Sequence, residues 1–181
     1  RMLFIIDNSL DMLRVAKTRA FLNFRIICAD ITRFYISKKI DFIFSVHDTM
    51  NYLLDTTDIL NMFHCVKEIM HQSSIFMFDI TTEHNILKNF DGKTSHFRFR
   101  NSSVQWSNNY DAQKKLIYSN LHFSRAGKTT VEEHVQRIYP INEITRLAIE
   151  SGLEVLGIHG DYTFESPHDE SIMINFITRK A

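Results

Sequence analysis

Four short apolar runs occur in the first 80 residues, and polar residues follow each of them. The runs cover residues 2–6, 25–29, 41–46 and 74–80 and are apolar nearly throughout. Strands that are buried on both faces of a parallel sheet have this composition. We therefore expect a parallel sheet that lies between layers of helices.

Apolar residues at helical spacing separate some of these runs. One such pattern extends from Leu10 to Ala20 with Ser9 as a typical N-cap, and a second extends from about residue 57 to 71. A third helix is predicted before Gly152, which is a favourable residue just past a helix end. Strands that alternate with helices predict an α/β fold with right-handed crossovers.

Residues 94–139 follow a different pattern, in which apolar and polar residues alternate. Phe97 and Phe99 have polar neighbours, and the same alternation continues through residues 117–123. This period of two, with polar turns between the runs, predicts an antiparallel β insertion of three or four strands. Two further strands are expected at 153–159 and 172–178. We interpret residues 1–181 as one domain that contains this insertion.

Composition narrows the class of protein. Among 181 residues, 21 basic residues balance 21 acidic ones, and 44% are hydrophobic. Such a chain has no electrostatic signature for nucleic acid or an anionic membrane surface, and we expect neither as a partner. No membrane-length apolar run or signal peptide is visible. Cys28 and Cys65 resemble small core residues, which favours a reducing compartment such as the cytoplasm.

An aspartate follows each of the first two predicted strands. Asp7 and Asp30 would lie at the carboxyl edge of neighbouring parallel strands, where open α/β sheets bind their ligands. A carboxylate can accept hydrogen bonds from two ribose hydroxyls or from an adenine amino group. The alternative is that both acids only cap loops. The glycine loop that usually lies about 20 residues upstream of such an acid is absent, because the first glycine is Gly92.

Two histidines are candidates for a general base. His47 follows the end of the third strand, where it could abstract a proton or could only support the backbone. His134 follows Glu132 and Glu133, and in a strand it would lie on the same face as Glu132. An exposed polar strand face is the alternative for His134. The spacing of the histidines matches no zinc site, so we expect no metal.

At these residues the chain resembles the class I S-adenosylmethionine-dependent methyltransferases. It is most similar to the small-molecule branch with an antiparallel insertion, which includes sugar N-methyltransferases. The matching segments span almost the whole chain in family order. They are FIIDNSLDMLRVAK, IICADITRF, DFIFSVHDTMNYLLD, SSIFMFDITT and EEHVQRIYPINEITRLAIESGLEVLGIHGDY.

The resemblance implies a Rossmann-like, mostly parallel sheet with helices on both faces and an antiparallel last strand. It implies S-adenosyl-L-methionine as the cofactor and a small-molecule amine or hydroxyl as the methyl acceptor. The implied cofactor-binding residues are Asp7 and Asn8 at the ribose, Asp30 and Ile31 at the adenine, and Ser45 and Val46 near the methionine part. The implied residues of the acceptor pocket are Trp106 and Tyr139 for binding, with His134 or His47 as the base.

The family's first strand and glycine loop have no counterpart in this sequence. That strand would lie between the one ending at Asp7 and the one ending at Ser45. We therefore hypothesise that these two strands pair directly, or that a missing N-terminal segment or a partner chain completes the sheet. Two other functions stay open: a nicotinamide-dependent oxidoreductase, and a non-catalytic remnant or scaffold of the same fold.

Overall fold

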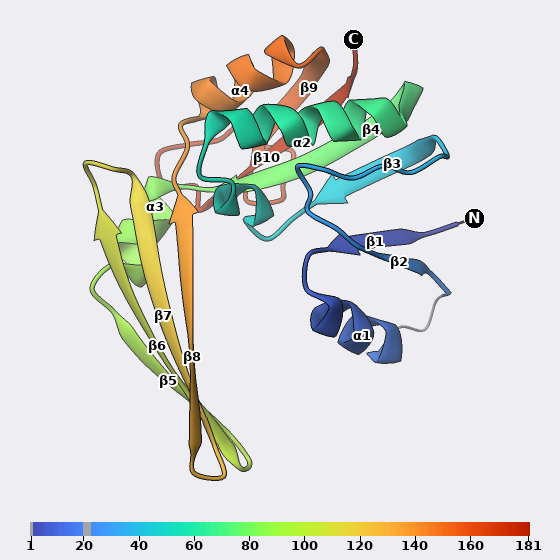
Figure 1. Cartoon of the computed structure of the whole chain (residues 1–181). Helices are drawn as coiled ribbons and strands as arrows, with labels where there is room; N and C mark the ends of the chain where they lie inside the picture. The colour runs from blue at the N-terminus through green and yellow to red at the C-terminus, as the bar shows by residue number, and fades with distance from the viewer. Residues whose placement is uncertain (1, 20–22) are drawn as a thin grey trace.

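The computed structural model describes residues 2–19 and 23–181, and its strands form three sheets. The smallest sheet holds β1 (Phe4–Asp7) and β2 (Arg25–Cys28), which pair in parallel. Helix α1 (Leu10–Arg19) buries Leu13, and the Ser9 hydroxyl caps its start by accepting a hydrogen bond from the Met12 amide at 3.3 Å. Figure 1 shows this N-terminal unit in blue.

The main sheet has the order β3-β4-β10-β9. Strand β3 (Ile40–Ser45) is parallel to β4 (Met70–Thr81), whereas β10 (Met173–Lys180) is antiparallel to both β4 and β9 (Leu153–Gly160). The predicted mixed α/β fold with an antiparallel last strand is confirmed. The parallel strands, however, are divided between two sheets.

The core lies between the main sheet and two helices, α2 (Thr56–Ile69) and α4 (Ile141–Glu150). Figure 1 shows both helices on the same side of this sheet. The rings of Phe78 and Phe176 stack with centroids 4.8 Å apart, and both side chains are fully buried. Gly152 ends α4 with φ +85°, a conformation that other residues adopt at a cost.

Strand β3 is not buried on both faces as the apolar run predicted. Ile43 packs against the core, but Phe42 and Phe44 point to the opposite face and are 52% and 56% exposed. Nor does β1 pair with β3, so direct closure of the sheet does not occur in the described part of the chain. Cys28 is also exposed rather than part of the core.

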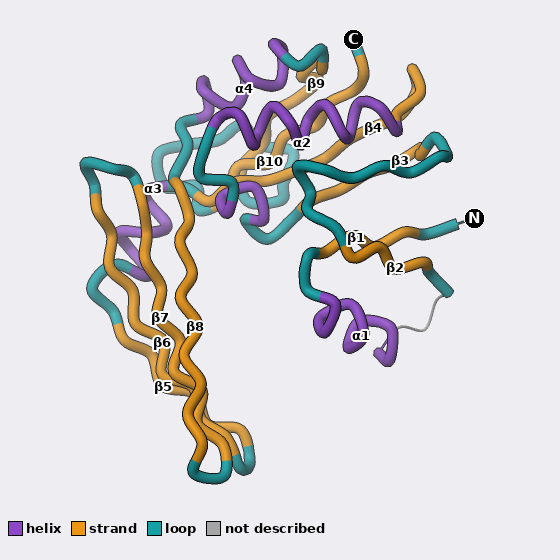
Figure 2. The backbone as a smooth tube through the Cα atoms, viewed as in Figure 1, coloured by secondary structure: helices purple, strands orange, loops and turns teal. Residues whose placement is uncertain are grey.

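The insertion is a four-stranded antiparallel sheet with consecutive strands. Its strands are β5 (Thr94–Phe99), β6 (Ser102–Asp111), β7 (Leu116–Arg125) and β8 (Lys128–Arg137). It extends away from the main domain as a long ribbon (Figure 2). Two short helical segments, α3 (Glu83–Asn85) and η2 (Ile86–Phe90), connect β4 to it and were not predicted. Glu83 fixes this junction by accepting hydrogen bonds from Tyr110 and Lys115, each at 2.7 Å.

Candidate active site between the sheet edge and the insertion

The parallel strands bring acidic side chains to one edge. The register pairs Asp7 with Cys28, and the Ala29 amide donates to the Asp7 carbonyl at 3.1 Å, so Asp30 follows two residues beyond the partner of Asp7. Ser45 ends β3, and Asp79 lies near the end of its parallel neighbour β4. The predicted placement of Asp7 and Asp30 on adjacent strand ends is therefore present.

Local hydrogen bonds orient both carboxylates. The Ser9 amide donates to Oδ1 of the half-buried Asp7 at 2.7 Å, and Asn8 beside it is exposed. The Thr32 amide and hydroxyl both donate to Oδ1 of Asp30 at 2.8 Å. These bonds lower the pKa of Asp30, which keeps it ionised at neutral pH. In each case the described hydrogen bonds use one carboxylate oxygen, so Oδ2 can accept from a ligand.

Asp79 organises the turn after β3. Its fully buried carboxylate accepts hydrogen bonds from the amides of His47 at 2.9 Å and Asp48 at 2.7 Å, and from the Tyr162 hydroxyl. His47 and Asp48 have φ of 60° and 53°, in the left-handed region, so the two bonds to Asp79 hold a strained turn. Asp79 was not among the predicted site residues, although it is an acid near a strand end, as Asp7 and Asp30 are.

The two predicted bases lie in different surroundings. The His47 side chain is exposed, and the structure brings its backbone rather than its ring to the site. His134, in contrast, is half-buried on β8 and lines a cavity with Trp106 of β6. Figure 1 shows these insertion strands rising toward the end of the main sheet.

This cavity has a volume of about 240 Å³ and lies between η1 (Thr49–Tyr52), the end of β4, the junction segments and the insertion. One part of its wall is apolar and another is polar. The apolar residues are Ile86, Phe90, Trp106, Ile117 and Leu121. The polar residues are Asp48, Tyr52, Thr81, Asn85, Ser119, His134 and Gln136.

Tyr52, His134 and Glu132 form a chain of hydrogen bonds at the polar wall. The Tyr52 hydroxyl lies 3.2 Å from Nδ1 of His134, and Nε2 of the same ring lies 3.4 Å from Oε2 of Glu132. When the neutral ring carries its proton on Nε2 and donates it in a hydrogen bond to Glu132, Nδ1 is the hydrogen-bond acceptor of the ring. Tyr52 was not selected from the sequence, because its partner lies 82 residues away along the chain.

Asp48 supplies a carboxylate to the same wall. Burial raises the pKa of Asp48, and the hydrogen bond that Gln136 Nε2 donates to its Oδ2 at 2.8 Å opposes this rise. Burial also raises the pKa of Tyr52, with a smaller contribution from the charge of Asp48. The Tyr52 hydroxyl thus stays protonated at neutral pH and can donate to His134.

Tyr139 takes a different position from the acceptor-pocket role that the resemblance implied. Its side chain is 3% exposed within the main core, and its hydroxyl donates to the Leu53 carbonyl. Burial raises its pKa to about 12. The structure therefore does not bring Tyr139 to the wall that His134 and Trp106 share.

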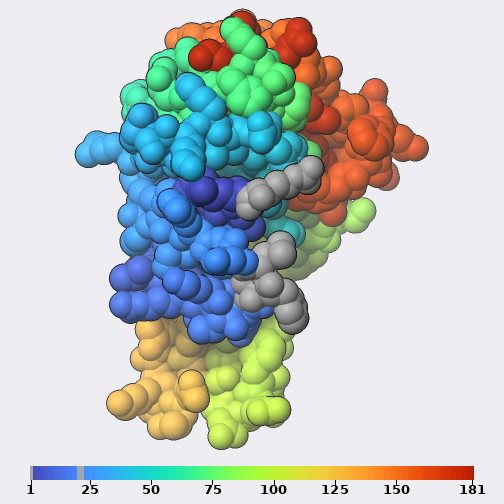
Figure 3. All heavy atoms as spheres, turned by 90° about the vertical axis from the view of Figure 1, so that its right-hand side faces the viewer, coloured from blue at the N-terminus to red at the C-terminus, as the bar shows by residue number. Residues whose placement is uncertain are grey.

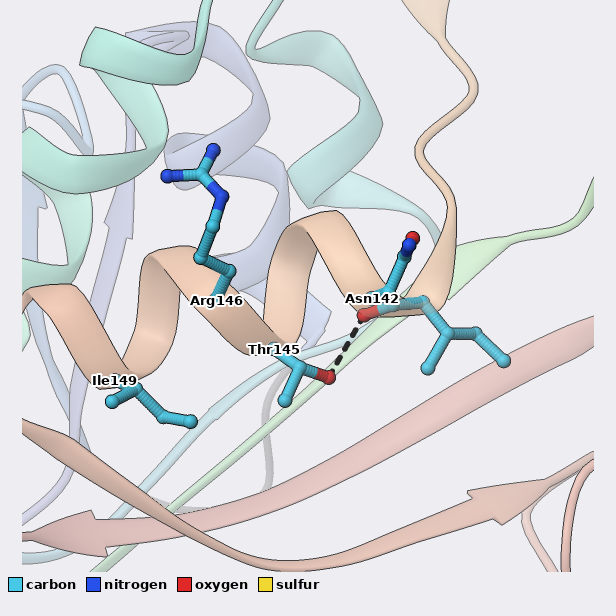
Figure 4. A pocket seen from close by; sticks show the side chains of 5 residues that line it. Asn142, Thr145, Arg146 and Ile149 are labelled. Carbon is cyan, nitrogen blue, oxygen red and sulfur yellow. Dashed lines mark hydrogen bonds between the residues drawn. The ribbon is translucent and has the colours of Figure 1, made fainter.

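A second, shallow hollow lies on the outer side of α4 and is shown in Figure 4. Ile141, Asn142, Thr145, Arg146 and Ile149 line it, and the Thr145 hydroxyl donates to the Ile141 carbonyl at 2.8 Å. These side chains offer no general base.

None of the helices in residues 2–19 and 23–181 has the length and apolarity needed to cross a membrane.

No protein-family model matches this sequence. The chain is 22% identical over 138 residues to the Putative methyltransferase YqeM of Bacillus subtilis, a match that covers 74% of this chain and 56% of that protein. A Putative methyltransferase of Geobacillus sp. is 24% identical over the same coverage. The chain thus spans little more than half the length of these curated relatives.

Solved structures give a closer likeness in three dimensions. An S-adenosylmethionine-dependent methyltransferase from Clostridium acetobutylicum superposes with a TM-score of 0.86 at 22% identity, over all of this chain and 76% of that one. The chain has the methyltransferase fold. CcbJ from Streptomyces caelestis, at 13% identity, has a TM-score of 0.81 over 98% of this chain and 74% of its own. The sugar N-methyltransferase KedS8 of Streptoalloteichus sp. gives 0.75 at 12% identity, over 98% and 71%.

The edge of this methyltransferase fold suits the adenosine half of S-adenosylmethionine. Asp7 and Asp30 each present a free carboxylate oxygen, which matches the hydroxyl and amino donors of adenosine. Ile31 is half-buried beside Asp30, and Ser45 and Val46 are half-buried at the end of β3. Whether these side chains contact the cofactor stays a prediction.

Proposed function

We propose that this chain binds S-adenosyl-L-methionine at the edge of β1, β2 and β3 and directs methyl transfer to a small molecule in the adjoining cavity. The observation that carries the proposal is the Tyr52–His134 pair in a cavity that Asp48 connects to the end of β3. The fold and the curated relatives support the same reaction class.

The cofactor supplies an already activated methyl group, so the protein needs to align the acceptor and exclude water. Trp106 and Phe90, whose ring centroids are 5.6 Å apart, form an aromatic wall for this purpose. The described lining contains Asp48 but no lysine or arginine. This wall therefore suits an amine or a hydroxyl acceptor better than an anionic one.

The proton of the acceptor would leave through Tyr52 and His134. When Nε2 of His134 donates to Glu132, Nδ1 is free to take the proton of the Tyr52 hydroxyl. The phenol oxygen of Tyr52 can in turn take a proton from the methyl-accepting group of the substrate. An amine must lose its proton to expose a lone pair, so this relay would matter most near neutral pH. KedS8 is described as a sugar N-methyltransferase, and an amino sugar is therefore our first choice of acceptor for this chain.

Calorimetry with S-adenosylhomocysteine tests the cofactor site directly. We expect saturable binding by the chain and an affinity at least about tenfold lower for Asp7→Ala, because the variant loses a charge-assisted hydrogen-bond acceptor. Asp11→Ala is the matched control, since Asp11 is an exposed acid at the start of α1. Absence of binding at millimolar ligand would favour the non-catalytic alternative, and binding of NAD(P) in its place would favour an oxidoreductase.

Transfer of a labelled methyl group from S-adenosylmethionine to a panel of amino sugars and sugar alcohols tests the acceptor. We expect label in the amines. Cofactor binding without transfer to any member would refute the acceptor class while leaving the cofactor site intact.

A further inference from the structure

The two faces of the insertion differ in polarity. Side chains alternate between the faces along each strand, and the strand register places three apolar residues side by side on one face. These residues are Phe97, Val104 and Phe123. The next position on each of the same strands lies on the other face and is polar. An antiparallel sheet with one face packed and one face in water has this pattern.

Near the junction with the main domain, the apolar face is covered by the protein itself. There Ile117 packs with Ile86 and Phe90 in a small core. Farther along the ribbon, Phe97 is 42% exposed and Phe99 is 60% exposed. Figure 3 shows the outer end of the insertion projecting below the N-terminal unit. A contiguous apolar surface that stays exposed is a sign of a binding site.

This surface continues the wall of the candidate acceptor cavity. Trp106 and Leu121 are neighbours in the strand register, and both line the cavity. The next row inward on the same face holds His134, and the next row outward holds Phe97. Neighbouring rows on one face are about 7 Å apart. A ligand whose reacting group lies at His134 therefore reaches Phe97 within about 14 Å.

Charge changes sign along the same face. Asp48 and Glu132 lie at the cavity end. At the outer end, Arg125 and Lys128 are register partners in the row of Phe99. The row between these two ends is uncharged. A complementary ligand therefore has an amine at one end, an apolar body, and an acidic group at the other end.

We propose that the methyl acceptor is an amphipathic small molecule of this kind. Its amine lies at His134, its apolar body lies on the row of Phe97, and its acidic group reaches Arg125. This inference rests on the proposed function, because it names the substrate class of the same cavity. A free amino sugar would leave the outer rows in water, so we expect the amine carrier to bear an apolar substituent.

Binding is tested with the methyl, octyl and carboxyheptyl glycosides of glucosamine, each below the concentration at which it forms micelles. Trp106 is the single tryptophan of the chain, so its fluorescence reports binding at this face without turnover. We expect the octyl glycoside to bind at least about tenfold more tightly than the methyl glycoside, because its chain leaves water. The carboxyheptyl glycoside should bind about threefold more tightly again, since an exposed ion pair contributes modestly. Equal affinities within either pair would overturn the inference.

Matched variants connect these preferences to the apolar face. Phe97→Ser should remove most of the preference for the octyl chain, and Phe97→Leu should retain it. Val131→Ser, which changes a 50% exposed residue on the opposite face, should have no effect. Arg125→Gln should remove only the gain from the carboxylate, whereas Arg98→Gln, on the opposite face, should keep that gain. Full preference in Phe97→Ser, or its loss in Val131→Ser, would overturn the inference.

Methyl transfer to the same glycosides separates this inference from the proposed function. If binding depends on the chain and on Phe97 as expected but no methyl group is transferred, the proposed function fails and the inferred ligand class stands. Transfer to the methyl and octyl glycosides with the same KM would refute the inference and leave the proposed function intact. Sedimentation tests the other occupant. Self-association that Phe97→Ser abolishes would mean that a second copy covers the face, and would overturn the inference.

Discussion

The Tyr52 hydroxyl and Nδ1 of His134 lie 3.2 Å apart, and the two rings meet edge to face with centroids 5.8 Å apart. This pair joins the turn after β3 to the last strand of the insertion. Both side chains also line the cavity. The proposed methyl acceptor would therefore be bound where two segments, distant in sequence, meet.

Replacing His134 by glutamine should lower kcat/KM for an amine acceptor by about 100-fold, because the proton relay from Tyr52 loses its base. Binding of S-adenosylhomocysteine should be unchanged, since His134 does not lie at the edge that holds Asp7 and Asp30. Steady-state kinetics and calorimetry check the two expectations. His122→Gln, on an exposed part of β7, is the control. Equal losses in both variants would contradict a proton-transfer role.

The pH dependence of stability should reveal the burial of Asp48. Its pKa is raised by burial, so the folded state binds its proton more tightly than the unfolded state does. The stability that this group contributes is then present below the unfolded pKa and is lost as pH rises through the folded pKa. Asp48→Asn should therefore be more stable than the natural protein at pH 7.

The stabilisation by Asp48→Asn should disappear as pH falls below 3.8, the ordinary pKa of an aspartate in the unfolded chain, because the carboxyl is then protonated in both states. Asparagine also tolerates the left-handed φ of 53° at this position. Urea unfolding at a series of pH values measures the difference, with Asp169→Asn as an exposed control. An asparagine variant that is less stable at every pH would show that the hydrogen bond from Gln136 outweighs the cost of burial.

Local pattern was enough to predict most of the strands and the longer helices, because apolar period and capping act within a few residues, but it did not predict the short segments α3 and η2. It also placed Asp7 beside Asp30, since neighbouring parallel strands must end at the same edge. Tyr52 could not be found in this way. Its role depends on the path of the insertion, which brings β8 back to the turn after β3.

Two expectations failed or changed for reasons of tertiary structure. The apolar run of β3 predicted burial on both faces, but the face with Phe42 and Phe44 has no covering element among the described residues. Tyr139 follows the insertion directly, yet the chain turns into the core there because Tyr139 donates to the Leu53 carbonyl and packs under α4. Sequence shows which residues are apolar, but not which neighbours reach them.

Replacing Asp79 by asparagine should destabilise the fold by about 2–3 kcal/mol. The buried carboxylate accepts two amides and a hydroxyl, and an amide nitrogen in its place would face one of these donors. Burial, together with the bond to Asp79, raises the pKa of Tyr162 to about 12. In the variant, that pKa should fall toward 10.0, because a neutral partner no longer opposes ionisation.

Urea unfolding and near-ultraviolet titration of tyrosine check the two effects of Asp79→Asn. The variant Asp58→Asn, which changes an acid in the first turn of α2, is a control for general loss of a negative charge. An unchanged tyrosine titration together with unchanged stability would show that the turn does not depend on the Asp79 carboxylate.

Asn51 should be the strongest single connection between the main sheet and the insertion. Its fully buried amide accepts a hydrogen bond from the Thr81 amide at 3.0 Å and donates to the Arg137 carbonyl at 2.7 Å. Leucine has a similar size but leaves both backbone groups without a partner. Asn51→Leu should therefore cost about 2–5 kcal/mol of unfolding free energy and speed amide exchange in β8.

The control variant is Asn61→Leu, on the exposed side of α2, which should change neither the unfolding free energy nor the amide exchange of β8. If β8 stays protected in Asn51→Leu, the insertion is held instead by Glu83 and its two partners at the other end of the junction.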